Sequence, residues 1–287
     1  MRPDRLMVDA RAKVNLFLRV LGRRPDGYHE LETLMVPITL ADRLELHAHA
    51  GSGDFRTLSF SLVVRGEQHL INGVPSDESN LVARAAAGLA EAAGVRGFAD
   101  VLLEKRIPSA AGLGGGSADA AATLLALNDL WGLGLSDEAL IEVASSVGSD
   151  VPALLAGAGV LAKGRGELIE RVDVPPYEWS IVTLPFGIST AEGFGWWDED
   201  RGPTGPDPEP VLLAARAGDV SALGPLLFND LEEPVCRRHP EVREAKHRLL
   251  GAGAAGAIMC GSGPTVAGLL PPGLTVEVPG AIRVTSG

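Results

Sequence analysis

A glycine-rich stretch, GLGGGS at residues 112–117, has the residue types and spacing of an anion-binding loop. Glycine loses more conformational freedom on folding than any other residue, so a run of glycines needs a physical reason. Without Cβ atoms, successive backbone N–H groups can face one concavity, and the N-terminus of a following helix adds partial positive charge. Helix-forming residues follow at once, from Ser117 to Leu130. The pattern therefore predicts a loop that binds phosphate.

Two widespread phosphate loops are excluded by residue identity. A Walker loop requires Lys and then Ser or Thr after its last glycine, whereas Ser117 and Ala118 follow Gly116. A dinucleotide-binding fingerprint would require glycine at position 117. The other interpretation of these glycines is a tight turn or crowded helix packing. Because the run directly precedes a long helix, we favour phosphate binding.

The overall charge disfavours several classes of partner. Among 287 residues, 25 are Lys or Arg and 37 are Asp or Glu, which gives a formal net charge of −12. A protein that binds nucleic acid through its general field would carry the opposite charge, and so would one that binds an anionic membrane surface. We therefore expect a small-molecule ligand held by a local site, with no nucleic-acid or membrane partner.

The cysteines and the apolar segments predict a soluble cytoplasmic protein. Cys236 and Cys260 match neither a metal-binding spacing nor a disulfide framework, which favours a reducing compartment. Residues 1–13 are interrupted by charges and contain no apolar signal segment. The longest apolar run, at 151–162, is shorter than the roughly 18 residues that a membrane span needs.

The elements around the loop predict an α+β domain. Alternating apolar residues predict strands at 12–22, 42–50, 56–66 and 99–108. The helical period predicts helices at 79–94, 117–130 and 136–148. Ser136 is the expected N-cap of the last of these helices. Because strands precede helices, a repeating βαβ arrangement is disfavoured.

The second half of the chain is organised differently. Strands are predicted at 159–172 and 178–187, and a strand, a glycine turn and a strand at 254–270. The acidic stretch 196–210 is rich in Pro and Gly and predicts an exposed loop. Helices are predicted at 211–233 and 240–250. We expect two domains, residues 1–160 and residues 161–287.

Three segments together resemble one enzyme family. IPSAAGLGGGSADAA, at 107–121, resembles the phosphate-binding motif of the GHMP small-molecule kinases, while 10–18 and 258–270 resemble its N-terminal and C-terminal motifs. The motifs occur in the family's order and span nearly the whole chain. The resemblance implies a ribosomal-S5-like N-terminal domain, a ferredoxin-like C-terminal domain and an active site in the cleft between them. It also implies ATP-dependent phosphorylation of an alcohol.

The resemblance assigns residues to ATP binding. The loop would contribute Pro108, Ser109, Ala110, Ala111, Gly112, Leu113, Gly114, Gly115, Gly116, Ser117 and Ala118. Lys105 and Asn80 match family positions near the nucleotide. Ala118 replaces a usual serine, which removes a hydroxyl donor but no backbone N–H, so phosphate binding should survive. ATP would bring Mg²⁺, for which the sequence identifies no protein ligand.

The segment DGYHE, at 26–30, resembles the branch of the family whose substrate is a cytidine-diphosphate-linked methylerythritol. The resemblance implies that the ring of Tyr28 stacks on cytosine and that His29 or its backbone forms a hydrogen bond with the edge of the pyrimidine. The other interpretation is a turn in which Tyr28 packs on the surface and His29 is solvated.

The segment at 187–197 resembles the one that supplies a second aromatic residue, across the base from Tyr28. Thr190 and Phe194 match best, and Trp196 and Trp197 are alternatives. Phe194 could instead belong to the core of the second domain.

The resemblance also identifies a catalytic pair. VGSDVP, at 147–152, matches the segment that carries the family's aspartate, which makes Asp150 the acceptor of the hydroxyl proton. By itself, an aspartate here would be read as an N-cap. Lys13 is its implied partner, keeping the carboxylate ionised and stabilising alkoxide charge, although a strand lysine is more often a solvated edge residue. Asn15, on the same strand face, could hold the substrate hydroxyl.

These assignments imply an ATP-dependent kinase for the 2-hydroxyl of 4-diphosphocytidyl-2-C-methyl-D-erythritol, in the non-mevalonate supply of isoprenoid precursors. The alternatives are another GHMP kinase, of the homoserine or mevalonate type, and a nucleotide-binding module without catalysis. Too few residues follow 270 for the family's usual helix and final strand. A dimer contact built from that helix is therefore in doubt, and we expect a monomer or a weak homodimer.

Overall fold

The computed structural model describes residues 4–51, 57–202, 204–275 and 278–287. Arg56, at the start of the strand predicted for 56–66, lies outside the described residues. The chain forms two compact units. Unit 1 comprises Met1–Ala12, Leu40–Ser109 and Gly115–Leu155, and unit 2 comprises Lys13–Thr39, Ala110–Gly114 and Ala156–Gly287. The predicted domain boundary at residue 160 stays a prediction, and the two units are described separately.

Unit 1 is built on long strands. Its strands are parts of β1 (Arg5–Arg23) and β2 (His29–Ala50), with β3 (Leu58–Arg65) and β4 (Gly97–Glu104). Strand β4 pairs antiparallel with β2 and parallel with β3. The predicted strand at 99–108 was too long at its C-terminal end. β4 ends at Glu104 because the N–H groups of Arg106 and Ile107 bond to the Asp42 carboxylate instead of a neighbouring strand.

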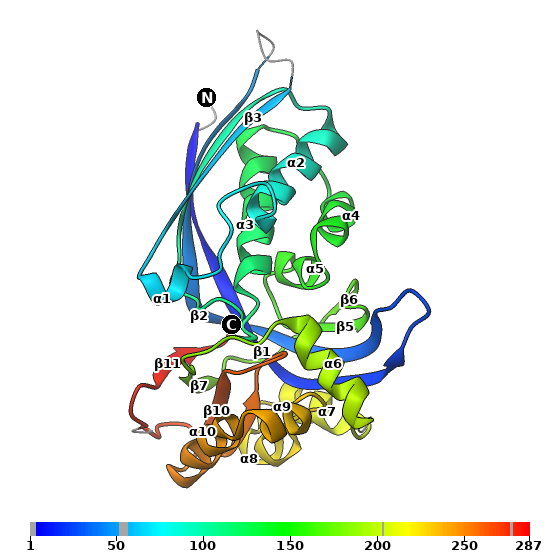
Figure 1. Cartoon of the computed structure of the whole chain (residues 1–287), viewed down its shortest axis with the longest axis vertical. Coiled ribbons are helices and arrows are strands. Elements are labelled where there is room, and N and C mark those ends of the chain that lie inside the picture. The colour runs from blue at the N-terminus through cyan, green and yellow to red at the C-terminus, as the bar shows by residue number, and fades with distance from the viewer. Residues whose placement is uncertain (1–3, 52–56, 203, 276–277) are drawn as a thin grey trace. The chain divides into compact units, whose positions relative to one another are not determined.

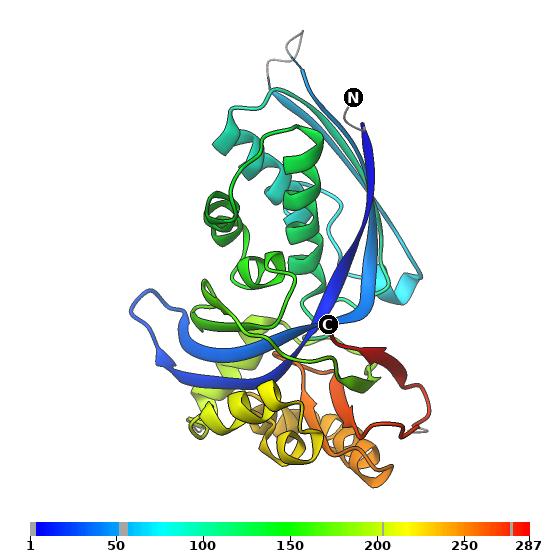
Figure 2. The ribbon, with the colours of Figure 1, turned by 180° about the vertical axis from the view of Figure 1, so that it is seen from behind.

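Helices cover one face of these strands (Figures 1 and 2). They are α2 (Leu81–Ala93), α3 (Gly115–Leu130), α4 (Asp137–Val147) and α5 (Val151–Leu155), whereas the short α1 (Gln68–Ile71) follows β3 and has no buried residue. Most of α3 is buried, with alanines and leucines on several sides, as expected of a helix inside the core. It begins at Gly115, two residues before the predicted start, and Ser136 caps α4 as predicted.

Unit 2 contains a four-stranded antiparallel sheet and a smaller set of paired strands. The sheet has the order β11-β7-β10-β9. Its strands are β7 (Glu178–Val182), β9 (Gly256–Met259), β10 (Val266–Leu270) and β11 (Ile282–Thr285). The N-terminal half of β2 pairs with β5 (Val160–Gly164), which pairs with β6 (Leu168–Arg171), while β1 pairs with β8 (Phe228–Asn229). The predicted strand, turn and strand at 254–270 are confirmed, and a final strand, β11, is present.

Two predictions for the helices of unit 2 were wrong. Its helices are α6 (Thr190–Asp200), α7 (Glu209–Ala217), α8 (Val220–Leu223), α9 (Glu232–Arg238) and α10 (Pro240–Gly251), with a 3₁₀ turn, η1 (Gly224–Leu226). Residues 196–200 of the loop predicted for 196–210 belong to α6. A capping box of Ser189 and Glu192 stabilises this helix. The helix predicted for 211–233 is interrupted, because Gly218 ends α7 in the left-handed conformation. No described helix is long and apolar enough for a membrane span.

Candidate active site

The part of the glycine loop in unit 2 rests on the C-terminal glycine turn. The N–H of Ile188 donates to the carbonyl oxygen of Ala110 at 2.9 Å, and that of Thr265 to the carbonyl of Ala111 at 3.4 Å. Gly112 has φ +76°, and a Cβ placed there would lie 1.9 Å from the carbonyl oxygen of Cys260. Glycine at 112 is therefore required by protein packing, which was the alternative interpretation of the run.

The glycines in unit 1 face different constraints. A Cβ on Gly115 would lie 3.0 Å from Cγ2 of Ile107 and 3.3 Å from Nζ of Lys105. A Cβ on Gly116 would meet its nearest neighbour, Cδ1 of Leu81, at 3.6 Å, an ordinary contact. The fold of the free protein therefore tolerates a side chain at 116. A glycine in the first turn of a long helix, with no packing reason for it, is consistent with close approach of a ligand.

Lys13 is buried in unit 2, with 3% of its surface exposed, so it is not a solvated edge residue. Its Nζ donates to Oδ1 of Asn15 and to the carbonyl oxygen of Gly112, both at 2.8 Å. Its backbone N–H donates to the carbonyl oxygen of Leu113 at 3.0 Å. An ammonium group has three hydrogens, so one remains for a ligand or another acceptor. β1 thus fixes both the lysine and the loop.

Asn15 connects Lys13 to the glycine turn. Its Oδ1 accepts from Lys13 and from the N–H of Gly261 at 2.9 Å, and its Nδ2 donates to Oγ1 of Thr33 at 2.8 Å. The hydroxyl of Thr33 donates to the carbonyl oxygen of Phe17 at 2.5 Å. The amide retains one N–H for a substrate hydroxyl, so that role stays a prediction. Thr33 was missed because it lies on another strand with no motif of its own.

A buried ionic cluster in unit 1 consists of Asp42 on β2, Lys105 just after β4 and Asp119 in the first turns of α3. Nζ of Lys105 is bonded to the carboxylates of Asp42 and Asp119, with the latter at 2.9 Å. All three residues are at most 4% exposed. Among the described residues, Oδ1 of Asp119 has no hydrogen-bond partner. Burial raises the pKa of Asp119 to about 7; the Lys105 charge opposes this rise and Asp42 adds to it.

Asn80 has a structural role at the start of α2. Its Oδ1 accepts from the N–H of Val82 at 2.9 Å, and its Nδ2 donates to the carbonyl oxygen of Pro75 at 2.6 Å. It is the N-cap of the helix and is 7% exposed. Like Lys105, it is committed to protein contacts in the free chain, and its role toward the nucleotide stays a prediction.

Asp150 lies between α4 and α5 in unit 1 and is half-buried. Its backbone carbonyl accepts from the N–H of Leu154 at 3.2 Å. Within the described part of the chain, its carboxylate accepts no capping hydrogen bond, so the N-cap interpretation is not supported. Lys13 belongs to unit 2, and the pairing of the two side chains stays a prediction.

Tyr28 and His29 differ sharply in environment. Tyr28 is 52% exposed, and the guanidinium carbon of Arg165 lies 4.9 Å from its ring centroid. The imidazole of His29 is 2.9 Å from Oδ1 of Asp198 through Nε2, and its side chain is 9% exposed, so it is not solvated. The ring of Phe194 stacks on His29 at a centroid distance of 4.7 Å.

Phe194 therefore lies against His29 in the structure, and the expected arrangement across a base from Tyr28 stays a prediction. Phe194, Trp196 and Trp197 also pack against the core of unit 2, as the alternative interpretation of Phe194 expected. The exposed Thr190 is the first residue of α6, the helix that carries all three aromatic residues.

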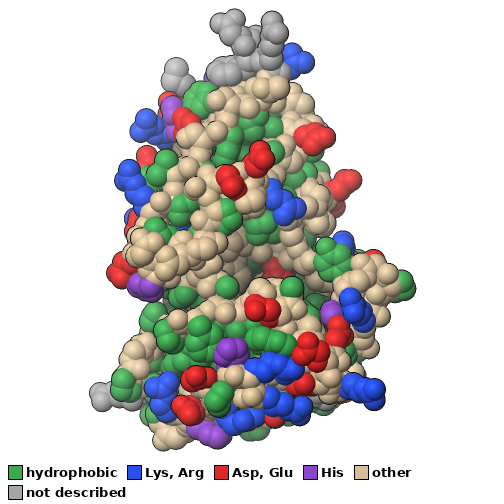
Figure 3. All heavy atoms as spheres, in the orientation of Figure 1, with side chains coloured by type: hydrophobic (Ala, Val, Ile, Leu, Met, Phe, Trp, Pro, Cys, Tyr) green, Lys and Arg blue, Asp and Glu red, His purple; other side chains and the backbone are tan. Residues whose placement is uncertain are grey.

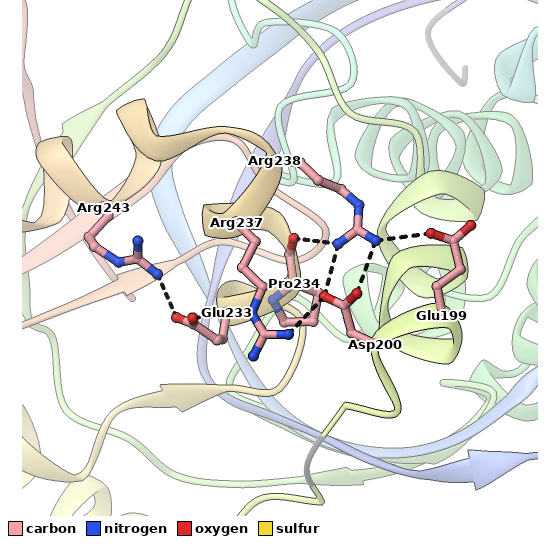
Figure 4. Close-up of polar contacts among 7 residues, drawn as sticks. All are labelled: Glu199, Asp200, Glu233, Pro234, Arg237, Arg238 and Arg243. Atoms are coloured by element: carbon pink, nitrogen blue, oxygen red, sulfur yellow. Dashed lines mark hydrogen bonds and ion pairs between the residues drawn. The ribbon is translucent and has the colours of Figure 1, made fainter.

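The C-terminal end of α6 is anchored to α9 by Arg238 (Figure 4). Its guanidinium donates to both carboxylate oxygens of Asp200, at 2.9 and 3.0 Å, and to Glu199 at 2.9 Å. These hydrogen bonds lower the pKa of Asp200 from its ordinary value. Figure 3 shows the mixed acidic and basic surface around these helices. The network adds to the packing of the helix that carries Phe194, and the Arg238 guanidinium also lies 5.3 Å from the centroid of the Trp196 ring.

The chain matches models of the GHMP kinases N-terminal domain at residues 80–158 and of the GHMP kinases C-terminal region at residues 211–277. It is 48% identical over 261 residues to a 4-diphosphocytidyl-2-C-methyl-D-erythritol kinase of Pelotomaculum thermopropionicum, covering 91% of this chain and 87% of the relative. The chain belongs to the GHMP kinase family. A kinase of the same name from Moorella thermoacetica is 44% identical over 280 residues, which cover 96% of this chain and 93% of the relative.

Solved structures agree with this assignment. A crystal structure of 4-(cytidine 5'-diphospho)-2C-methyl-D-erythritol kinase has a TM-score of 0.77 and 35% identity, covering 98% of this chain and 99% of that one. A homoserine kinase from Cytophaga hutchinsonii has a TM-score of 0.71 at 18% identity, covering 99% and 95%, and shares the fold. The predicted GHMP fold is confirmed. The protein is a small-molecule kinase with ATP as its phosphoryl donor.

The buried ionic cluster of this GHMP kinase predicts that its stability depends on pH. The pKa of Asp119 rises from 3.8 to about 7 in the fold, so the folded chain holds a proton that the unfolded chain releases. The free energy of unfolding should therefore fall by about 1 kcal/mol per pH unit between about pH 4 and 7 from this group, and level off above. Asp119→Asn should remove this contribution. Urea unfolding of both proteins at about pH 5 and about pH 8 measures it, and equal pH dependence in the two proteins would contradict the raised pKa.

Proposed function

We propose that this GHMP kinase transfers the γ-phosphoryl group of ATP to the 2-hydroxyl of 4-diphosphocytidyl-2-C-methyl-D-erythritol, giving the 2-phosphate and ADP. The observation that carries the proposal is the 44–48% identity, over more than nine-tenths of this chain, to kinases of that name. The reaction belongs to the non-mevalonate supply of isoprenoid precursors. We further propose a cytoplasmic enzyme that is a monomer or a weak homodimer.

The glycine loop and the first turn of α3 would hold the triphosphate. The first N–H groups of a helix have no partner within it, and they carry partial positive charge toward an anion. Gly116 supports this role, because packing in the free protein would accept a side chain there. A glycine at this position is therefore better explained by the close approach of a ligand. Lys105 and Asn80 would border the nucleotide.

Mg²⁺ would arrive on the phosphate oxygens of ATP, where it neutralises charge on the transferred group. The described residues contain no cluster of three or more His, Cys, Asp or Glu side chains placed to hold a metal ion. The metal would be held mainly by the nucleotide.

Asp150 and Lys13 would carry the chemistry on the substrate side. Asp150 would accept the proton of the 2-hydroxyl as its oxygen attacks the γ-phosphorus. Lys13, fixed by Asn15 and the carbonyl of Gly112, would keep this carboxylate ionised and stabilise charge on the attacking oxygen. Its buried position makes the ammonium pre-organised and therefore effective.

The exposed ring of Tyr28 would stack on cytosine, with His29 at the pyrimidine edge and Thr190 and Phe194 nearby. Tyr28→Ala is expected to raise the KM for the cytidine substrate about 5- to 150-fold, because stacking on a base contributes about 1–3 kcal/mol. Tyr28→Phe keeps the ring and is the matched control. Since the side chain is 52% exposed, neither change should disturb folding.

The assay is ADP release with ATP, Mg²⁺ and a panel of alcohols. The proposal expects turnover of the cytidine compound and none of homoserine or mevalonate. Turnover of homoserine or mevalonate alone would instead assign another member of the family. ATP binding without ADP release for any alcohol would indicate a module without catalysis.

A further inference from the structure

We propose that Asp42 is a positioning residue for ATP binding. Its carboxylate would hold in place the residues that lead into the phosphate loop. It lies on β2 in unit 1 and is fully buried. The inference rests on ATP binding at the loop, which it shares with the proposed function, and it is independent of which alcohol is phosphorylated. Asp42 does not need to touch the nucleotide, because it acts through the residues that it holds.

The Asp42 carboxylate receives donors from three consecutive residues. Its Oδ1 accepts from the N–H of Arg106 at 2.5 Å and from the N–H of Ile107 at 2.8 Å, and its Oδ2 accepts from Nζ of Lys105. These residues come directly after β4 and directly before Pro108. The carboxylate thus replaces a strand partner at the point where the chain leaves the sheet.

The residues held by Asp42 support the first turn of α3. A Cβ on Gly115 would lie within 3.0 Å of Cγ2 of Ile107 and 3.3 Å of Nζ of Lys105, so the backbone of Gly115 rests directly on these two side chains. A displacement of residues 105–107 would move the N–H groups of that turn with it. Phosphate binding by backbone N–H groups depends on such positions.

The two carboxylates around Lys105 are not equivalent. Asp42 accepts from three donors, two backbone N–H groups on Oδ1 and Nζ of Lys105 on Oδ2, whereas Asp119 bonds only through Oδ2 among the described residues. A buried carboxylate with all its donors is costly to replace, because removing its charge leaves a buried cation short of a partner. Asp42 therefore holds the backbone at residues 106 and 107, while the Asp119 carboxylate accepts from the side chain of Lys105.

Isothermal titration with ATP tests the inference without any alcohol substrate. Asp42→Asn keeps an acceptor for the N–H groups but removes the negative charge that pairs with Lys105. Asp42→Glu keeps the charge but displaces the carboxylate by a methylene group. Both are expected to raise the Kd for ATP by about 10- to 100-fold, as displaced positioning groups do. Glu104→Gln, which removes an exposed charge that is paired with Arg106, is the matched control and should bind ATP normally.

A kinetic comparison separates positioning from general damage. If the cytidine compound proves to be the substrate, the KM for ATP should rise in the Asp42 variants while the KM for that compound stays unchanged. A lower fraction of folded enzyme would instead lower only the apparent kcat. Normal ATP affinity in folded Asp42 variants would overturn the inference, and so would an equal loss in Asp119→Asn.

Amide hydrogen exchange of the unaltered protein provides a test that survives if the variants fail to fold. The N–H groups of Arg106 and Ile107 should be strongly protected before ATP is added, with little further protection afterwards. Rapid exchange in the free protein, followed by protection with ATP, would show that the nucleotide and not Asp42 orders the start of the loop.

Discussion

The variant Asp150→Asn is expected to lower kcat by about 10²- to 10⁴-fold and to leave the KM for ATP almost unchanged, because a positioned proton acceptor contributes about that much to the rate. The amide has nearly the same size but cannot accept the hydroxyl proton. The carboxylate makes no capping bond within the described residues, so the fold should not depend on its charge. Steady-state ADP release measures the effect.

Glu142→Gln is a suitable control, because it removes an exposed negative charge from α4 in the same unit. It should leave kcat at the level of the unaltered enzyme. Lys13 is a less suitable position, since its loss also removes one of the donors to Asn15 and the side-chain donor to the carbonyl of Gly112. Wild-type turnover by Asp150→Asn would remove Asp150 from the mechanism.

Two alanine substitutions in the glycine loop are expected to have opposite signatures. Gly112→Ala should destabilise the protein by about 3 kcal/mol or more, because it combines a left-handed φ with a Cβ 1.9 Å from a carbonyl oxygen. Gly116→Ala should leave the Tm nearly unchanged and raise the Kd for ATP about tenfold or more, because a methyl group would occupy the space that the phosphates approach. Thermal unfolding and ATP titration of each variant distinguish the two effects.

Gly157→Ala is the control for backbone strain alone. This glycine has φ +63°, and a Cβ placed there would meet no atom within 4 Å, so its substitution should cost only about 1–2 kcal/mol. If Gly116→Ala binds ATP as tightly as the unaltered protein, the phosphates do not approach that residue. Equal stability of Gly112→Ala and Gly157→Ala would contradict the packing of the loop against Cys260.

Local sequence rules succeeded where a few neighbouring residues decide the structure. The alternating segments became strands, Ser136 capped its helix, and the turn at 254–270 formed between two strands. They failed at 196–210, where acidic, Pro-rich and Gly-rich composition indicated a loop. Part of that segment is helical because Trp196 and Trp197 pack against the unit 2 core and Arg238 binds Asp200, contacts that composition does not reveal.

The sequence by itself determined the family motifs, the glycine loop and the residues to test, because these depend on residue types at short spacing. Only the tertiary structure decided which glycines the protein needs and which it leaves to a ligand, since Gly112 is constrained by Cys260 far along the chain. It also revealed Asp42, whose donors lie 63 to 65 residues away. A lone aspartate in a strand has no signature, and its role arises because folding brings three donors to one buried carboxylate.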